Sequence, residues 1–250
     1  MSMKNKNPLG FLSGSMLKLI AVLVMTVDHY AVLFEPYSDA WRIPGRIAFP
    51  IFAFFIAEGF HYTKSRIRYF LLLAVSGAVF QAVYFLFTGD GMRNIFITLA
   101  LSVIPLFALD FAKRVFFSEN SRLLARILAT LPTLLSVIAL YYVDIYFAPD
   151  YGFYGCLLPL FASLFRVPRG LDVPDFAQRL DILPLRLLSF AIPLVLLNFT
   201  FGGVQHFSLL ALPLLALYSG SRGKWKMKYF FYIYYPVHLV ALEGLYLLLG

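Results

Sequence analysis

Apolar runs that approach the length of a membrane span recur along the whole chain, and this feature restricts its possible folds more than any other. A helix needs about 20 apolar residues to cross the hydrocarbon core of a bilayer. Hydrophobic residues make up 61% of the 250 residues and charged residues 14%, whereas a soluble domain is roughly half apolar and a quarter charged. The sequence therefore predicts an integral membrane protein that crosses the bilayer several times.

Charges, prolines and glycines bound these runs and predict an all-α, polytopic transmembrane helix bundle. We expect about nine spans in a single domain that covers residues 1–250, and the polar stretch 166–181 is expected to be a loop. The second and sixth segments are short for a span. The expected segments are 17–34, 47–61, 69–87, 94–112, 123–147, 151–165, 183–200, 206–219 and 229–249.

The Lys and Arg residues fall mainly in alternate loops, which orients the chain. The positive-inside rule then predicts a cytoplasmic N-terminus and an outer C-terminus. This placement explains most of the net charge of +8, so no nucleic-acid partner is expected. Only Arg42, Arg46 and Arg93 fall on the opposite side. The residues assigned to the cytoplasmic side are Lys4, Lys6, Lys64, Arg66, Arg68, Lys113, Arg114, Arg122, Arg166, Arg169, Arg179, Arg222, Lys224, Lys226 and Lys228.

Some ionisable residues lie inside predicted spans, where each costs several kcal/mol and is therefore a candidate for function. A structural ion pair between helices is an equal alternative for any one of them, because a buried polar group needs a partner. Arg46, Asn94 and Asp144 lie at the ends of spans. The residues inside spans are Asp28, His29, Glu58, His61 and His238.

Helical geometry separates the roles of these residues. Asp28 and His29 are adjacent and point about 100° apart, so Asp28 is expected to pair with Arg46 of the next span. That pairing would leave His29 to face a cavity. In the last span, Tyr235 and His238 share one face. These residues together predict a polar site within the bundle.

Several other classes of site are not supported. Glu58 and His61 form a Glu-x-x-His pair, but a di-metal site needs a second such pair and the chain has none, so no metal is expected. The single Cys156 excludes an intrachain disulfide and is expected to be an inert core residue. A Gly-rich phosphate loop, which an ATP-driven pump would need, is also absent from the sequence.

Motifs in consecutive spans resemble those of the TraX family, and the resemblance covers nearly the whole chain. It implies a multi-pass protein of the bacterial cytoplasmic membrane that is related to membrane acyltransferases. A member of the family acetylates pilin, but pilin is not assumed to be the acceptor here. The motifs are LKLIAVLVMTVDHY (Leu17–Tyr30), GRIAFPIFAFFIAEGFHYTKS (Gly45–Ser65), RNIFITL (Arg93–Leu99), DYGFYG (Asp150–Gly155), FSLLALPLLALYSGSRG (Phe207–Gly223) and KYFFYIYYPVHL (Lys228–Leu239).

The resemblance implies direct transfer of an acyl group, most simply acetyl, from cytoplasmic acyl-CoA to an amine or hydroxyl of a peptide or cell-envelope acceptor. His29 would be the general base, and Asn94, Tyr235 or His238 would stabilise the oxyanion. A two-step route through an acyl-histidine is the alternative mechanism. The implied catalytic residues are Asp28, His29, Arg46, Glu58, Asn94, Tyr235 and His238. The residues expected to hold the acyl-CoA phosphates are Lys64, Arg66, Arg222, Lys224 and Lys228.

Two functions of other classes remain as alternatives. A proton-coupled transporter would also place Asp, Glu and His in spans, but it usually carries a repeat between its halves and the sequence has none. A non-catalytic scaffold would need no ionisable residues in its spans. The acceptor, the acyl chain and the oligomeric state do not follow from the sequence.

Overall fold

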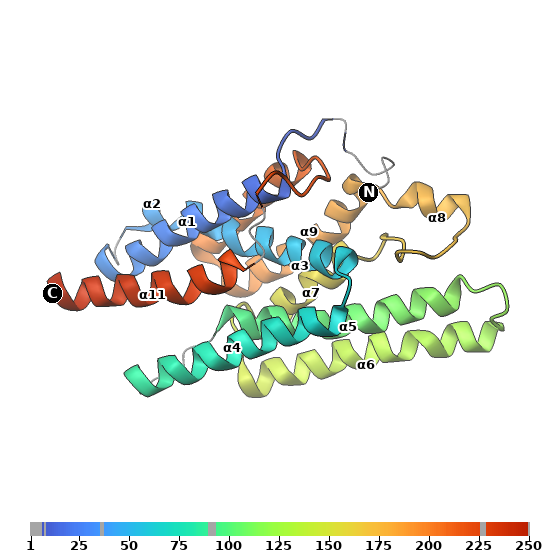
Figure 1. Cartoon of the computed structure of the whole chain (residues 1–250), viewed down its shortest axis with the longest axis horizontal. Coiled ribbons are helices and arrows are strands. Elements are labelled where there is room, and N and C mark those ends of the chain that lie inside the picture. Colours follow the sequence, from blue (N-terminus) through green and yellow to red (C-terminus); the bar gives the residue numbers. More distant parts are fainter. Residues whose placement is uncertain (1–6, 8, 36–37, 90–93, 226–228, 250) are drawn as a thin grey trace. The chain divides into compact units, whose positions relative to one another are not determined.

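The computed structural model describes residues 7, 9–35, 38–89, 94–225 and 229–249 of the chain. All regular elements within these residues are helices, and the strand-like pairing among them is one isolated bridge between Leu12 and Tyr218. The predicted all-α class is therefore confirmed (Figure 1).

Seven helical segments are long and apolar enough to cross a membrane, which confirms a multi-pass membrane protein. Two further predicted spans are shorter apolar helices, α7 (Gly152–Ala162) and the consecutive η3 (Gly203–Leu210) and α10 (Ala211–Ala216). The count of nine spans and the side of the N-terminus remain predictions. The seven segments are α1 (Gly14–Phe34), the stretch Asp39–Tyr62, α4 (Arg66–Thr88), α5 (Ile95–Phe116), α6 (Leu123–Phe147), α9 (Leu183–Phe201) and α11 (Phe230–Leu249).

The stretch Asp39–Tyr62 begins earlier than its predicted span, 47–61. It consists of α2 (Asp39–Arg42), η2 (Pro44–Ile47) and α3 (Ala48–Tyr62). Proline is tolerated in the first turn of a helix, so Pro44 opens the 3-10 turn and does not separate a loop from the span.

The prediction that 166–181 is a loop is wrong in part, because this stretch contains the six-residue helix α8 (Asp175–Leu180). Asp175 lies in its first turn and Arg179 in its last turn. An acidic residue at the start of a helix and a basic one at its end both interact favourably with the helix dipole.

The chain divides into two compact units, one of residues 1–52 and 198–250 and the other of residues 53–197. In the first unit, α1 packs against α2, η2 and α11 (Figure 1). Ser13 caps α1 by accepting a hydrogen bond from the Met16 amide. The close packing of η2 on α1 depends on Gly45, because a Cβ there would lie 2.7 Å from Cγ of Asp28. The prediction of one domain remains untested.

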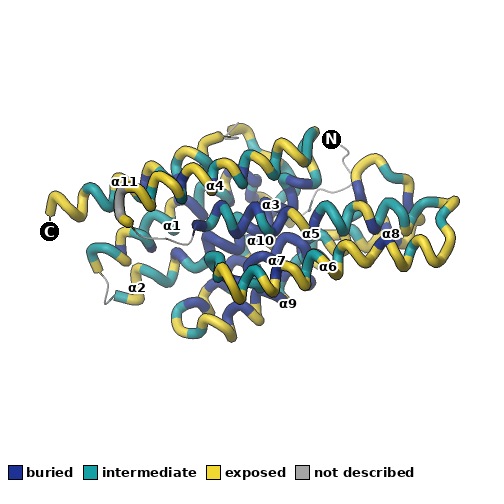
Figure 2. Tube along the Cα trace, turned by 90° about the horizontal axis from the view of Figure 1, so that it is seen from below, coloured by how far each residue is buried: buried dark blue, intermediate teal, exposed yellow. Residues whose placement is uncertain are grey.

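In the second unit, α5 packs against α4, α6 and α7 (Figure 1). Figure 2 shows that α7 is largely buried and that much of α6 is exposed. Apolar residues such as Leu124 and Leu135 line the exposed side of α6, as expected of a helix that faces lipid. Cys156 is 1% exposed in a core cluster with Leu140 and Leu157, which agrees with its predicted packing role.

Candidate functional site

Asp28 forms the predicted ion pair with Arg46 in the first unit. Nη2 of Arg46 donates to Oδ2 of Asp28. Nη1 of the same guanidinium donates to Oε1 of Gln205 over 3.4 Å, and Nε of Arg42 lies 3.9 Å from Oδ1 of Asp28. The carboxylate is buried, and the guanidinium neutralises it while joining α1 to η2 and η3.

His29 and His238 are hydrogen-bonded to each other, although they lie at opposite ends of the chain. Nδ1 of His29 is 2.7 Å from Nε2 of His238, and Nδ1 of His238 is 2.9 Å from the Tyr234 carbonyl oxygen. A carbonyl only accepts, so Nδ1 of His238 carries a proton and, in a neutral ring, its Nε2 is an acceptor. His29 therefore donates through Nδ1, and its Nε2 keeps a lone pair. This tautomer is assigned from the hydrogen bonds.

Aromatic rings enclose the two imidazoles. The His29 and His238 rings are stacked with centroids 5.0 Å apart, and Tyr234 stacks on His238 at 5.1 Å. Tyr235 packs its ring edge-on against both, at 6.3 Å from His29 and 5.6 Å from His238. The hydroxyls of Tyr234 and Thr26 are 2.7 Å apart. His238 is buried and His29 is half-buried, so the pair has a packed and defined orientation.

The local sequence explains why His238 adopts this orientation. Tyr234 lies one helical turn before His238, and side chains on a helix lean toward its N-terminus. The imidazole thus reaches back to the Tyr234 carbonyl group. Four of the five predicted residues of this unit consequently form two pairs that share the helix α1: Asp28 with Arg46 of η2, and His29 with His238 of α11. The fifth, Tyr235, packs against the two imidazoles.

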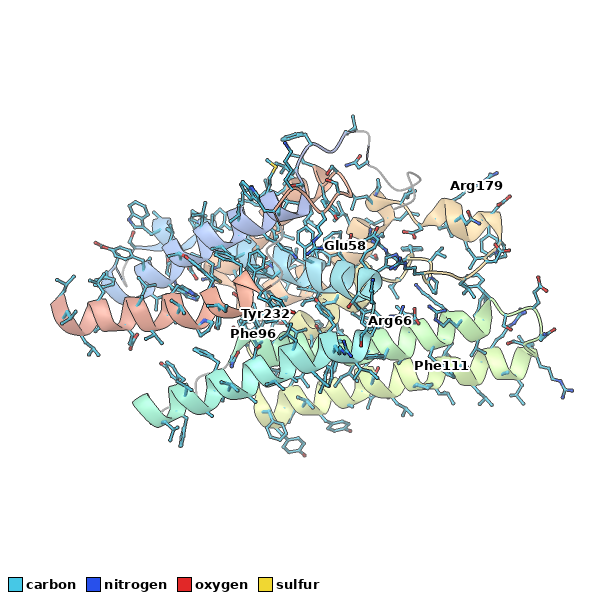
Figure 3. The ribbon with its side chains drawn as sticks, viewed as in Figure 1. Glu58, Arg66, Phe96, Phe111, Arg179 and Tyr232 are labelled. Atoms are coloured by element: carbon cyan, nitrogen blue, oxygen red, sulfur yellow. The ribbon has the colours of Figure 1, made fainter. Side chains whose placement is uncertain are left out.

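Glu58 belongs to the second unit, where it lies on α3 (Figure 3). Its Oε1 accepts from both Arg166 and Arg186, and all three side chains are at most 7% exposed. The carboxylate is thus engaged by two guanidinium groups. Among the described residues, three or more His, Cys, Asp or Glu side chains are nowhere grouped so that they could hold a metal.

Sequence reasoning does not single out Arg186. The sequence nevertheless contains a feature that could have identified it, because Arg186 is a charged residue in the fourth position of α9, a segment that is predicted to be a span. Arg166 falls in a predicted loop, and its burial beside Tyr62 and Glu58 is not expected from the sequence.

Asn94 also lies in the second unit and acts as a helix cap. Its Oδ1 accepts from the Phe96 amide over 2.9 Å, and its Nδ2 donates to the Gly77 carbonyl oxygen over 2.8 Å. These contacts occupy both ends of the amide and fix the start of α5 against α4. The oxyanion role expected for Asn94 remains a prediction that these contacts do not favour.

The residues expected to hold phosphates fall into three groups. Arg66 donates to both carboxylate oxygens of Asp110, over 2.9 Å at Oδ1. Lys64, Arg222 and Lys224 are exposed. Lys228 lies outside the described residues.

Comparisons with known proteins agree with the membrane fold and the motifs. The sequence model of a family described as "TraX protein" matches residues 13–246. "Probable fimbrial assembly protein FimC, serogroup H1" of Dichelobacter nodosus is 29% identical over 257 residues, which cover 92% of this chain and 94% of that protein. "Uncharacterized protein RP591" of Rickettsia prowazekii (strain Madrid E) is 38% identical over 66 residues, 26% of this chain and 25% of that protein. No solved structure matches the chain.

Proposed function

Because this chain belongs to the TraX protein family, we propose that it is an integral membrane acyltransferase whose donor is cytoplasmic acyl-CoA, most simply acetyl-CoA. The observation that carries the proposal is the hydrogen-bonded pair of His29 and His238 inside membrane-spanning helices. Histidine is the side chain that most often serves as a general base in enzymes.

The tautomer of His29 supports its Nε2 as the reacting nitrogen of this proposal. Nε2 of His238 accepts a hydrogen bond from Nδ1 of His29, and Nδ1 of His238 donates to the Tyr234 carbonyl oxygen, which fixes its orientation. Nε2 of His29 is then the basic atom of the pair. In catalytic triads, the general base is oriented by a further residue that also stabilises its charged form. His238 would have that role toward His29.

The proposed step is a direct acyl transfer. Nε2 of His29 takes the proton from the amine or hydroxyl of the acceptor as that atom attacks the thioester carbonyl. A C–N or C–O bond forms, the C–S bond breaks, and the proton passes from His29 to the leaving thiolate of CoA. The same lone pair would serve as the nucleophile in the two-step route, which forms an acyl-histidine at Nε2.

Other residues of the first unit support this base. Tyr235 packs edge-on against the imidazoles, and its hydroxyl is proposed to stabilise the oxyanion. Asp28 and Arg46 are positioning residues in this proposal, because their ion pair fixes η2 against the turn of α1 that carries His29. Since each is engaged by the other, neither is assigned a proton-transfer role.

The acceptor is proposed as a peptide amine or an envelope hydroxyl. The Dichelobacter nodosus relative is named as a fimbrial assembly protein, so a fimbrial subunit is the first acceptor to test. Of the basic residues expected to hold the donor phosphates, Arg222 and Lys224 belong to the same unit as His29 and are exposed, so they are proposed to bind them.

Purified full-length protein in lipid nanodiscs provides the test. Release of free CoA thiol and incorporation of radiolabelled acetyl would be measured with and without a fimbrial subunit or a model amine. We expect His29→Ala to lower transfer by roughly 10²- to 10⁴-fold, while leaving the folded yield unchanged.

His206 provides a matched control, because it is an exposed histidine of the same unit whose Nδ1 contacts the Gly203 carbonyl oxygen at 2.8 Å. His206→Ala should retain full transfer. A folded His29→Ala protein with wild-type transfer would show that His29 has a structural role only, and the absence of any acetyl-CoA-dependent reaction in the wild type would refute the proposed function.

A further inference from the structure

Positive charge is in excess at one end of the second unit. Two carboxylates are each shared by two cations, since Glu58 binds Arg166 and Arg186, and Asp110 binds Arg66 and Arg114. Lys113 adds a further positive charge, and Asp181 adds one carboxylate, whose Oδ2 accepts from the Val167 amide over 3.0 Å. The surplus is two positive charges. The members are Arg66, Lys113, Arg114, Arg166, Arg186, Glu58, Asp110 and Asp181.

Much of this surplus is buried. Arg166 and Arg186 are 4% and 7% exposed in their side chains. Uncompensated charge away from water costs several kcal/mol per ion. The C-terminal end of α7 offsets part of this charge, because Lys113 donates to the Ser163 and Arg166 carbonyl oxygens over 2.6 and 2.7 Å, just past the end of that helix. Main-chain carbonyls supply only partial charges, so a net positive potential remains.

A cavity opens among these groups. Its volume is about 30 Å³, roughly twice what one water molecule needs by this measure. Residues from α3, α4, α5 and the segment after α7 line it, and Figure 3 shows Arg66 at the first turn of α4. Its polar lining is His61, Arg66, Asp110, Lys113, Ser163 and Arg166.

We propose that this cavity binds one phosphate group. Guanidinium and ammonium donors bind phosphate oxygens through short, charge-assisted hydrogen bonds. A phosphate with one or two negative charges would neutralise the surplus that the carboxylates leave. The cavity admits the oxygens of a single phosphate but is too small for a nucleotide. The inference rests on the charges and the cavity, so binding of phosphate can be found or refuted whether or not the protein transfers acyl groups.

Three sources carry this chemistry: the 3′-phosphate of coenzyme A, a phospholipid headgroup and inorganic phosphate. Binding to delipidated full-length protein in detergent would be measured by calorimetry with CoA, dephospho-CoA and inorganic phosphate. Native mass spectrometry with phosphatidylglycerol would test the lipid. Preference for CoA over dephospho-CoA identifies the first source, retention of the lipid the second, and equal binding of all three soluble probes the third.

Lys113→Met and Arg66→Gln remove one cation each from the cavity. Each should weaken the preferred probe about tenfold or more, because a hydrogen bond to a charged group contributes roughly 1.5–3 kcal/mol. Arg179→Gln is the matched control, since it removes an exposed arginine of α8 outside the cavity lining, and it should bind like the wild type.

A second measurement covers the case in which these variants do not fold. Ser163→Cys, in a Cys156→Ala background, places a thiol in the lining for labelling with an anionic thiosulfonate. Phosphate or the preferred probe should slow this labelling severalfold. The proposal is overturned if no phosphate-bearing probe or lipid binds the wild type, if folded Lys113→Met and Arg66→Gln bind as well as Arg179→Gln, or if the probe does not protect the introduced thiol from labelling.

Discussion

Nδ1 of His29 lies 2.7 Å from Nε2 of His238, and this contact joins the first long helix of the chain to the last. Because the Tyr234 carbonyl fixes the proton on His238, the contact also decides which nitrogen of His29 is basic. The same geometry makes His238 an acceptor and not a donor toward His29, so in the proposed transfer His238 is assigned the role of a positioning residue.

The first prediction follows from that assignment. His238→Leu removes the acceptor and should lower kcat by about 10- to 100-fold, less than the loss expected for a missing base, with little change in KM. His238→Gln offers an amide oxygen that can accept from Nδ1 of His29, so it should recover part of kcat. Steady-state transfer assays would check this, and equal activities of the Leu and Gln variants would contradict the positioning role.

The second prediction concerns the ion pair of Asp28 and Arg46. Removal of either partner, by Asp28→Asn or Arg46→Gln, should lower the free energy of unfolding by about 3–5 kcal/mol, because it leaves a buried charge. The double variant should lose less than the sum of the two. Denaturation of the protein in mixed micelles measures the cycle, and additive losses would falsify the coupling.

The third prediction tests the packing of η2 on α1. Gly45→Ala places a methyl group against Asp28 and should destabilise the protein by about 1–3 kcal/mol, as overpacking does. Gly244→Ala is the matched control on α11, where an added Cβ meets no atom within 4 Å. That change should be neutral or slightly stabilising, since Ala favours helix over Gly. Equal thermal stabilities of the two variants would argue against a close approach at Gly45.

The course of α7 bears on the number of spans. Thr98, near the start of α5, donates to the Asp150 carbonyl oxygen over 2.8 Å, just before α7. Lys113, near the end of α5, donates to the Ser163 carbonyl oxygen just after α7. Despite its 11 residues, α7 and its flanks therefore follow α5 from one end toward the other.

The fourth prediction uses this course. If α7 crosses the membrane, the segment 166–181 is on the cytoplasmic side, whereas a chain with only seven spans would place it outside. Arg179→Cys in a Cys156→Ala background should react with an impermeant thiol reagent only after the cells are permeabilised. A C-terminal alkaline phosphatase fusion should be active outside in either case and serves as the control. Labelling of the introduced thiol in intact cells would contradict the nine-span arrangement.

Local pattern was sufficient to predict most of the helices. The predicted limits 123–147 coincide with those of α6, because a loop with charged residues precedes that apolar run and Pro149 follows it. The start of the second span is harder to predict. Pro44 and Gly45 indicate a break in a helix, and the sequence does not reveal that both fit into a 3-10 turn. The helix α8 has only six residues, which is too short for an apolar periodicity from which a helix could be predicted.

Residues of the candidate site can be predicted from the sequence where the free-energy cost of burying an ionisable group is a sufficient criterion. Asp28, His29 and His238 stand out as ionisable residues within apolar runs, and Arg46 follows as the cation at similar depth. The partners of Glu58 were not predictable by the same argument, because they are 108 and 128 residues further along the chain. Sequence distance of that size gives no information on contact without the tertiary fold.

That separation has a consequence for how the protein is made. Ribosomes add about 5–20 residues per second, so Glu58 emerges roughly 5 to 26 seconds before the arginines that pair with it. Until Arg166 is synthesised, the Glu58 carboxylate on α3 has neither of these two arginine partners. The ion-pair group around Glu58 is therefore completed only when α9, the last helix of the second unit, supplies Arg186.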